Sequence, residues 1–204
     1  TQSSTSPQFG TYSCDINNAS ADENIQVTGA DFRASTTGSF TLEFWLYPIS
    51  EGTSQSSGGA FLLHAVAAIC TSSPVTGSNY ADFGYFWWNA ASGGTLGLAN
   101  AGTPATGVSA NTWHHVAYVV DMAAGAGNER QVYVDGVRFK QLSNAAANFN
   151  TLYFGNMGYG ASLSSGLWAN YLTQCRIDSV RFTDGVARYT GASFTVPTTD
   201  FPPY

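Results

Sequence analysis

The chain has 204 residues, of which 44% are hydrophobic and 10% are charged, and it carries a formal net charge of −6 at pH 7. This hydrophobic content excludes a disordered chain. An acidic protein with one lysine, Lys140, also lacks the basic patches that nucleic acid or an anionic membrane requires. Its surface must consist mainly of Ser, Thr, Asn, Gly and Ala, and such a scarcity of charge favours assembly with other proteins.

The first half of the chain predicts short strands behind a polar arm. Residues Thr1–Gln8 are rich in Ser and Thr and predict an extended arm, and residues 9–204 predict one domain because no linker or repeat divides them. Glu43 lies on the polar face of a cleanly alternating segment that Pro48 is expected to end. The strands predicted here are Phe9–Ile16, Asn24–Val27, Ser39–Tyr47, Ala60–Cys70, Asp82–Asn89 and Thr95–Ala99.

Residues 111–140 are the clearest part of the pattern. The segment Trp113–Asp121 is largely apolar on both faces, which predicts a central strand covered on both sides, and Asp135-Gly136 predicts a tight hairpin turn. Adjacent residues of a strand point to opposite faces, so His114 and His115 cannot share a ligand, and we expect His115 in the core with a satisfied hydrogen bond. The later predicted strands are Trp113–Asp121, Gln131–Asp135, Val137–Lys140, Thr151–Gly155 and Cys175–Phe182.

Many short strands separated by turn signals predict an all-β fold, an antiparallel β-sandwich or jelly roll. A single helical turn is predicted at Asp184–Tyr189. No stretch reads as a secretory signal or a membrane span, because the longest apolar run, Ala60–Cys70, is too short to cross a bilayer and contains His64.

The three cysteines, Cys14, Cys70 and Cys175, show no metal-ligand spacing. An odd number of thiols fits a reducing compartment, where each acts as a small buried apolar residue. A bridge between Cys14 and Cys175, which lie in the first and last predicted strands, is the less favoured alternative.

Five segments appear in an order that resembles a known family. They read SFTLEFWLYP, NTWHHVAYVVD, RQVYVDGVRF, LYFGNMGY and CRIDSVRFTDGVARYTGASFTVPTTDFP. Together they are similar to the laminin-G-like branch of the concanavalin A-like lectin/glucanase superfamily, over about nine-tenths of the chain. The last segment is similar to versions found on bacteriophage structural proteins. The resemblance implies two antiparallel sheets packed face to face, one of them with a concave outer surface, but this fold carries several functions.

The carboxylates do not predict an enzyme. Glucanases of this fold carry clustered acids in an E-x-D-x-x-E pattern, and glycoside hydrolysis needs two acids flanking the bond. Asp178 and Asp184 match the structural terminal motif of the family instead. None of the glutamates has an acid two residues after it; they are Glu23, Glu43, Glu51 and Glu129.

No cofactor is expected. Calcium is the alternative, because several relatives bind it through loop oxygens and Asp22-Glu23-Asn24 with Asp31 could contribute ligands. Without an EF-hand-like spacing, a solvated turn is the favoured interpretation of this acidic loop.

The aromatic residues give the best indication of a ligand. In Asp82–Asn89 the alternation places Tyr85 and Trp87 on one face and Phe86 and Trp88 on the other, and a sandwich strand turns only one face to the core. Exposed aromatic rings suit the C–H face of a sugar. The alternative is that these rings are buried under loops or against a neighbouring subunit. The predicted ligand-binding residues are Tyr85, Trp87, Trp88, Tyr159, Trp168 and Tyr171.

These patterns, with the resemblance, lead to a functional hypothesis. The chain is expected to be a non-enzymatic bacteriophage virion protein, a tail fibre or adhesin or a capsid decoration, made in the host cytoplasm and able to bind host-surface glycans. We expect it to work as a homo-oligomer or docked on other virion proteins, with the Thr1–Phe9 arm lying across a neighbour. The alternative is a bacterial extracellular carbohydrate-binding module.

Overall fold

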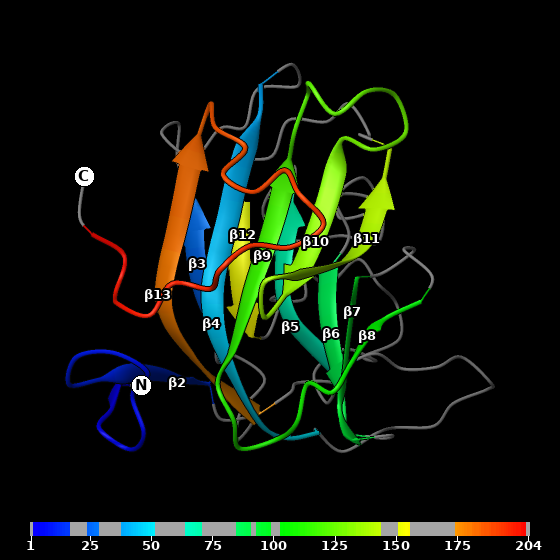
Figure 1. The fold of residues 1–204 in the computed structure, drawn as a ribbon. Coiled ribbons are helices and arrows are strands. Elements are labelled where there is room, and N and C mark those ends of the chain that lie inside the picture. The colour runs from blue at the N-terminus through cyan, green and yellow to red at the C-terminus, as the bar shows by residue number, and fades with distance from the viewer. Residues whose placement is uncertain are drawn as a thin grey trace, which may run out of the picture.

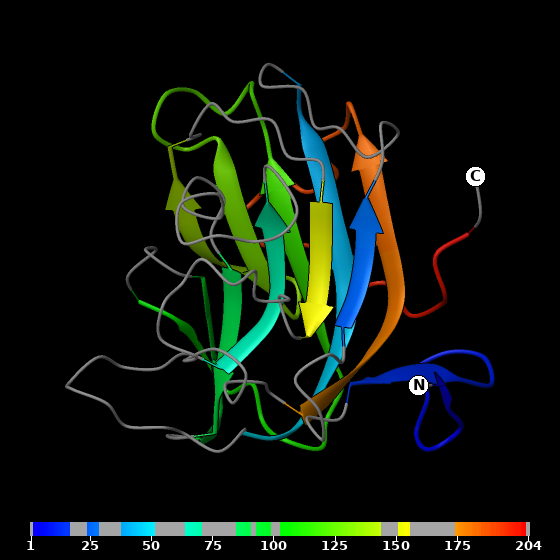
Figure 2. The same ribbon diagram turned by 180° about the vertical axis from the view of Figure 1, so that it is seen from behind.

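The strands of the chain pair antiparallel into two sheets that pack face to face (Figure 1). The structure, a computed structural model, describes residues 2–16, 24–28, 38–51, 64–70, 85–90, 93–98, 103–143, 151–155 and 174–202. The predicted all-β antiparallel sandwich is therefore confirmed. Figure 2 shows the second sheet from behind, with β12 in yellow beside β3 in blue.

The larger sheet has seven strands in the order β1-β2-β13-β4-β9-β10-β11, and the smaller has six in the order β3-β12-β5-β6-β7-β8. The strands of the seven-stranded sheet are β1 Gln2–Ser3, β2 Ser13–Ile16, β13 Gln174–Asp184, β4 Phe40–Ser50, β9 His114–Val120, β10 Arg130–Val134 and β11 Val137–Leu142. Those of the six-stranded sheet are β3 Asn24–Thr28, β12 Thr151–Gly155, β5 His64–Cys70, β6 Tyr85–Asn89, β7 Thr95–Leu98 and β8 Ala105–Thr106.

The core fills the space between the sheets with alternate residues of each strand, as the pleat requires. Phe44 of β4 packs edge-on against Phe86 and Phe154 of the other sheet, with ring centroids 6.0 and 5.0 Å away. A second, smaller apolar cluster lies on the outer face of the seven-stranded sheet and contains Ala117, Val119 and Tyr133. Strand β9 contributes residues to both clusters, so the predicted burial of both faces of this central strand is confirmed.

The hairpin between β10 and β11 forms as predicted. Asp135 and Gly136 have φ angles of 50° and 76°, the two positive values that a two-residue turn of type I′ requires. A Cβ atom at Gly136 would lie 2.3 Å from the carbonyl oxygen of Phe194, so this position tolerates no side chain.

The structure corrects two predicted strand boundaries and one predicted helical turn. The strand predicted at Phe9–Ile16 begins only at Ser13. Strand β4 continues through Pro48 to Ser50. The pairing of β4 with β9 stops where Leu46 faces His114, so Pro48 pairs with β13 alone. Proline has no backbone N–H, and this position does not require one for pairing with β9. The helical turn predicted at Asp184–Tyr189 does not form, because Asp184 ends β13 and the following residues are irregular. The two-residue strands β1 and β8 are too short for alternation to reveal.

The polar arm was expected to need a neighbour for its anchorage, and this expectation is wrong. Gln2 and Ser3 pair with Cys14 and Ser13 of β2 in the same chain. The backbone N–H groups of Gln8 and Phe9 donate to the carboxylate of Asp178, at 2.9 and 3.2 Å. The Phe9 ring also packs edge-on against Trp45, with centroids 5.6 Å apart. The arm is thus part of its own sandwich.

Cys14 and Cys175 are free thiols. They lie on the adjacent strands β2 and β13, but Cys14 faces Ile177 and Cys175 faces Ile16, so the two are diagonal rather than directly opposite. Burial raises the pKa of the Cys175 thiol, which keeps it protonated and unreactive. The side chain of Cys70 lies outside the described residues. Among those residues, no helix is long and apolar enough to span a membrane.

Candidate functional site

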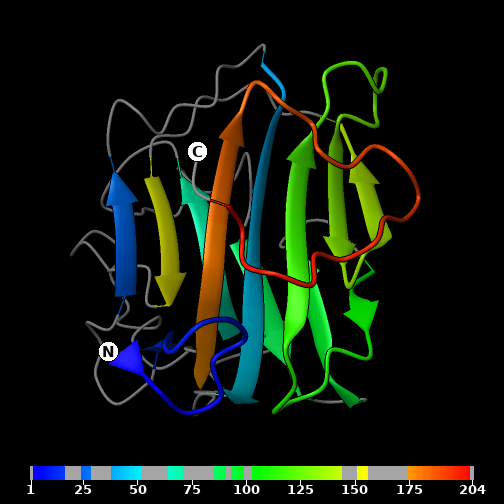
Figure 3. The ribbon, with the colours of Figure 1, turned by 60° about the vertical axis from the view of Figure 1, so that its left-hand side comes forward.

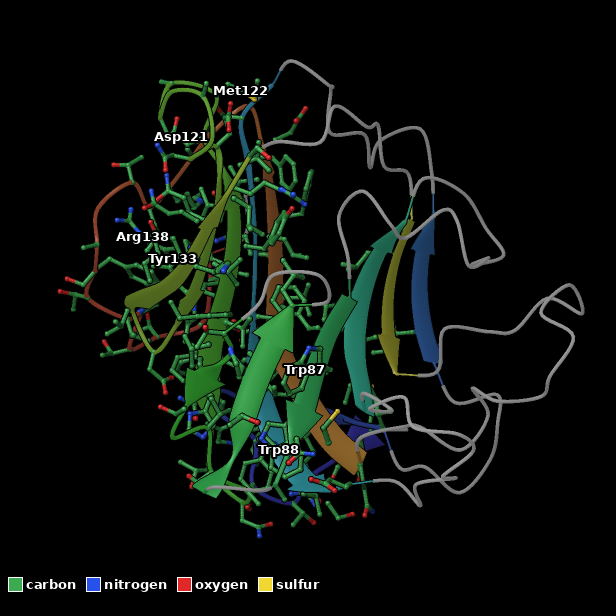
Figure 4. All side chains as sticks on the ribbon, turned by 90° about the vertical axis from the view of Figure 1, so that its right-hand side faces the viewer. Trp87, Trp88, Asp121, Met122, Tyr133 and Arg138 are labelled. Atoms are coloured by element: carbon green, nitrogen blue, oxygen red, sulfur yellow. The ribbon has the colours of Figure 1, made fainter. Side chains whose placement is uncertain are left out.

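Trp87 and Trp88 lie on opposite faces of β6, as the alternation predicted (Figure 4). Trp88 is fully buried in the core, and its Nε1–H donates to the carbonyl oxygen of Val108 at 2.7 Å. The prediction that Trp88 belongs to the ligand surface is wrong, because its ring points between the sheets. Trp87 points to the outer face of the six-stranded sheet and is half-buried.

The Trp87 indole packs closely against the neighbouring strand because that strand offers a glycine. Trp87 is paired with Gly97 of β7. A Cβ atom built on Gly97 would lie 2.3 Å from both Cε2 and Cζ2 of the indole, which is possible only when the ring rests on the glycine backbone. The indole therefore packs against the Gly97 backbone on the outer side of the sheet.

The outer face around Trp87 is polar. Asn89 of β6 and Thr95 of β7 are half-buried, lie directly opposite each other, and are joined by a hydrogen bond from Thr95 Oγ1 to the Asn89 carbonyl oxygen at 3.5 Å. Trp87 itself makes no hydrogen bond or ring contact with another described residue. We call Trp87, Gly97, Asn89 and Thr95 the tryptophan platform.

The remaining predicted ligand residues lie outside the described part of the structure. These are Tyr159, Trp168 and Tyr171, together with the side chain of Tyr85, whose backbone belongs to β6. The same holds for the candidate calcium ligands Asp22, Glu23, the Asn24 side chain and Asp31. Within the described ranges, no group of three or more His, Cys, Asp or Glu side chains could hold a metal ion.

The outer face of the seven-stranded sheet has a different cover. Residues 186–202, which we call the C-terminal strap, cross this face over β4, β9 and β10 (Figure 3). The strap pairs with the β10–β11 hairpin through bonds from Phe194 N to the Gly136 oxygen and from Arg138 N to the Ala192 oxygen, at 2.8 and 2.9 Å. The Tyr133 hydroxyl lies 2.9 Å from the Gly191 oxygen, which adds a further attachment.

Glu43 forms the centre of the interactions under the strap. Its side chain is fully buried on the outer face of β4. Oε1 accepts from Arg181 Nε at 2.8 Å, and Oε2 accepts from the Tyr189 hydroxyl at 2.7 Å and pairs with His115 Nε2 at 3.1 Å. Burial alone raises the pKa of Glu43, but the hydrogen bonds from these three residues and the charge of Arg181 outweigh it, so the pKa is below its ordinary value.

Tyr189 is affected in the opposite direction. Burial and the hydrogen bond to Glu43 raise the pKa of its hydroxyl, so Tyr189 stays a neutral donor. Its ring also stacks on Phe194, with centroids 3.6 Å apart and an interplanar angle of 5°. No local sequence pattern indicates this cluster, since Glu43, His115 and Tyr189 are far apart along the chain and only the register of β4 with β9 brings the first two together.

The two histidines lie on opposite faces, as predicted, but the expected location of His115 needs correction. His115 is buried and bonded to Glu43, in the layer under the strap rather than between the sheets. His114 lies at the end of the inter-sheet space, with Nδ1 2.7 Å from Asp135 Oδ2 and Nε2 3.1 Å from the Ser109 oxygen. Both ring nitrogens of His114 therefore lie within hydrogen-bond distance of an oxygen atom.

An open pocket of about 420 Å³ lies at the edge where the β10–β11 hairpin meets β8. Its charged group is Asp135, whose Oδ1 accepts from His115 N at 2.9 Å while Oδ2 contacts His114. Because both oxygens are engaged, the pocket adds no free charged group. It is lined by Pro104, Ala105, Thr106, Val134, Asp135, Val137 and Phe139.

The two antiparallel sheets packed face to face define a lectin-like β-sandwich. The chain belongs to the concanavalin A-like lectin/glucanases superfamily, because the Laminin_G_3 model of this superfamily matches residues 19–188. This confirms the laminin-G-like resemblance of the sequence. No curated protein matches the chain.

Solved structures resemble the chain at low identity. The binding domain of Paraclostridial Mosquitocidal Protein 1 is 12% identical with a TM-score of 0.48, and the match covers 93% of this chain and 43% of that one. Trypanosoma rangeli sialidase is 11% identical with a TM-score of 0.46, and the match covers 72% of this chain and 20% of that one. Mouse laminin alpha1 chain domains LG4-5 are 16% identical with a TM-score of 0.35, and the match covers 89% of this chain and 47% of that one. The chain therefore spans less than half the length of each of these proteins.

Proposed function

We propose that the chain is a non-enzymatic glycan-binding domain of a bacteriophage virion protein, located on a tail fibre, another adhesin or the capsid surface. The observation that carries the glycan part is the close packing of Trp87 on the Gly97 backbone, on the outer face of the six-stranded sheet. An indole in this position gives a rigid apolar surface for the C–H face of a sugar ring.

The polar groups of the tryptophan platform suit the hydroxyl groups of the same ligand. Asn89 and Thr95 flank the ring on the two strands that carry it. The Nε1–H of Trp87 has no partner among the described residues and is not buried, so it can donate to a sugar oxygen. A shallow platform of this kind binds weakly by itself and gains strength when several copies act together.

The proposal of a non-enzymatic role is supported by the carboxylates of the opposite sheet. Both oxygens of Glu43 accept hydrogen bonds, and the residue is fully buried under the strap. Asp178 uses Oδ2 for the N–H groups of Gln8 and Phe9 and Oδ1 for that of Ser179. Neither carboxylate can reach a glycosidic bond, whereas hydrolysis needs two that do.

The virion part rests on the resemblance of the C-terminal segment to bacteriophage structural proteins and on the scarcity of surface charge. We propose that the domain acts as a homo-oligomer or docked on other virion proteins. A bacterial extracellular carbohydrate-binding module is the second candidate, since the tryptophan platform serves it equally well. Mass spectrometry and immunogold labelling of purified phage particles separate the two, because only a virion protein copurifies with the particles in stoichiometric amounts.

A glycan array tests the binding itself. The wild-type domain should give hits that Trp87→Ala abolishes, with the melting temperature nearly unchanged because the ring lies on the outside. Tyr12→Ala is the control, since Tyr12 is an exposed aromatic residue, at 55% exposure, that directly precedes β2 of the other sheet. An array without hits, or hits that survive Trp87→Ala, would contradict glycan binding at this platform.

A further inference from the structure

We propose a second binding site, selective for sugars that carry a carboxylate, at one end of the outer face of the seven-stranded sheet. It consists of Arg176, Tyr47 and Trp113, and we call it the arginine site. Its ligand class is a uronic or sialic acid residue. It goes beyond the proposed function, because it lies on the opposite sheet from the tryptophan platform and requires a charged ligand.

The three residues come together on neighbouring strands. Tyr47 of β4 and Arg176 of β13 are directly paired, and the Arg176 guanidinium carbon lies 5.2 Å from the centroid of the Tyr47 ring. The Trp113 ring, just before β9, lies 5.2 Å from the Tyr47 ring at 57°. All three side chains are half-buried, so the cluster reaches the surface where the C-terminal strap does not cross.

The orientation of Trp113 is fixed by the N-terminal arm. Its Nε1–H donates to the carbonyl oxygen of Ser6 at 3.1 Å. Asp178 in turn holds the arm through the N–H groups of Gln8 and Phe9. The bond to the arm therefore restrains the indole ring through its nitrogen. A preorganised ring costs little entropy when a ligand binds.

The guanidinium of Arg176 has unused hydrogen-bond donors, unlike that of Arg181. Arg181 donates to Glu43 at 2.8 Å, whereas the Arg176 Nε lies 3.9 Å from Asp15 Oδ2, too far for a hydrogen bond. This Nε is buried without a partner among the described residues. The terminal nitrogens have no partner there either and are not buried. Only 14% of the side chain is exposed, and this partial desolvation strengthens a bond to a carboxylate.

The charges facing Arg176 explain why the ligand must be a sugar rather than any anion. Asp15 lies on β2 at 3.9 Å and offsets the positive charge, and the other nearby carboxylate, Asp178, is committed to the arm. A free anion therefore meets little net positive charge. A carboxylate attached to a ring gains the aromatic surface of Tyr47 and Trp113 in addition.

Calorimetric titration of the whole chain with three probes tests this ligand class. Methyl β-glucuronide should bind at least about tenfold more tightly than methyl β-glucoside, which lacks the carboxylate, and than acetate, which lacks the ring. Tryptophan fluorescence should change with glucuronide. Equal affinity for the glucoside would overturn carboxylate recognition, and equal affinity for acetate would overturn the role of the two rings.

Variants locate the site. Arg176→Gln should weaken glucuronide binding about tenfold or more, and Arg176→Lys, which keeps the charge but loses the planar fork, should weaken it by less. Circular dichroism checks the fold, and the lysine variant keeps the test decisive if the glutamine variant does not fold. Lys140→Gln is the control, because it removes a positive charge from β11 of the same sheet away from the site, and it should leave glucuronide binding unchanged. Wild-type affinity in both Arg176 variants, or an equal loss in Lys140→Gln, would overturn the arginine site without bearing on glycan binding at the tryptophan platform.

Discussion

The outer faces of the two sheets differ in what covers them. On the seven-stranded sheet the C-terminal strap lies over a buried carboxylate, Glu43, and its aromatic residues fill the surface (Figures 1 and 3). On the six-stranded sheet Trp87 packs on a glycine and is half-buried. The chain's own residues thus close one of these surfaces, and we propose that the other one binds a ligand. Burial on the outer face of a sandwich does not by itself mark the core.

The largest expected effect tests the two faces of β6. Trp88→Ala should lower the free energy of unfolding by about 3–5 kcal/mol, because the ring is enclosed between the sheets and its truncation leaves a cavity. Trp87→Ala should lower it by less than about 1 kcal/mol, as expected for a surface residue. Urea denaturation of the two variants measures the difference, and equal losses would contradict the opposite placement of the rings.

The cover of the other sheet is tested at Glu43. Glu43→Gln should destabilise the protein by about 2–3 kcal/mol, since Arg181 then loses a charged acceptor in a buried site. Asp184→Asn, at an exposed acid on β13, is the matched control and should change stability by less than about 0.5 kcal/mol. Comparable losses in both variants would mean that the buried network does not hold the strap.

The same residue predicts a pH dependence. The pKa of Glu43 is lower in the folded chain than its ordinary value of 4.5, so the folded state favours the ionised form. This stabilisation is complete above that ordinary value and is lost as the pH falls through the folded pKa. The melting temperature of the wild type should therefore decrease more steeply with falling pH below 4.5 than that of Glu43→Gln. Parallel curves would show that another group controls acid unfolding.

A smaller effect is expected at Gly97. Gly97→Ala places a Cβ atom into the Trp87 indole, and the displaced ring should cost about 1–3 kcal/mol and abolish glycan binding. In the double variant with Trp87→Ala the collision is absent, so most of this loss should disappear in a double-mutant cycle. Additive losses would show that the indole does not rest on the glycine.

The smallest effect concerns one attachment of the strap. The Tyr133 hydroxyl contacts the carbonyl oxygens of Tyr189 and Gly191, at 3.1 and 2.9 Å, beside Arg138 (Figure 4). Tyr133→Phe should cost about 0.5–1.5 kcal/mol. Limited proteolysis should then cut within residues 186–202 faster than in the wild type, while a cleavage rate that stays the same would exclude this contribution.

The alternating patterns predicted most of the strands because a strand's side-chain period depends on local sequence. The Asp135-Gly136 turn was predictable for the same reason, since only particular residues accept two positive φ angles. Which ring of β6 faces the core was not predictable: both Trp87 and Trp88 are apolar, so alternation separates them without saying which faces the other sheet.

Features that depend on strand order could not be predicted. The pairing of β4 with β9 and β13 brings Glu43 opposite Ala117 on one side and Arg181 on the other, and no local pattern reports this register. The arginine site is hidden for the same reason, because Tyr47, Trp113 and Arg176 come from three separate strands or their ends. The polar arm misled because hydrogen bonds from its backbone anchor it, and a count of apolar side chains does not include these.

The position of β13 between β2 and β4 has a consequence for synthesis on the ribosome. Until residues 174–184 have left the exit tunnel, both neighbouring strands present open edges, and Glu43 lacks Arg181 and Tyr189 as partners. Open edges of this kind invite pairing with other nascent chains. Closing the sheet also requires contacts between distant parts of the sequence, which slows folding. The domain should therefore fold only after translation has passed the strap, and it would benefit from chaperones that shield β4 until then.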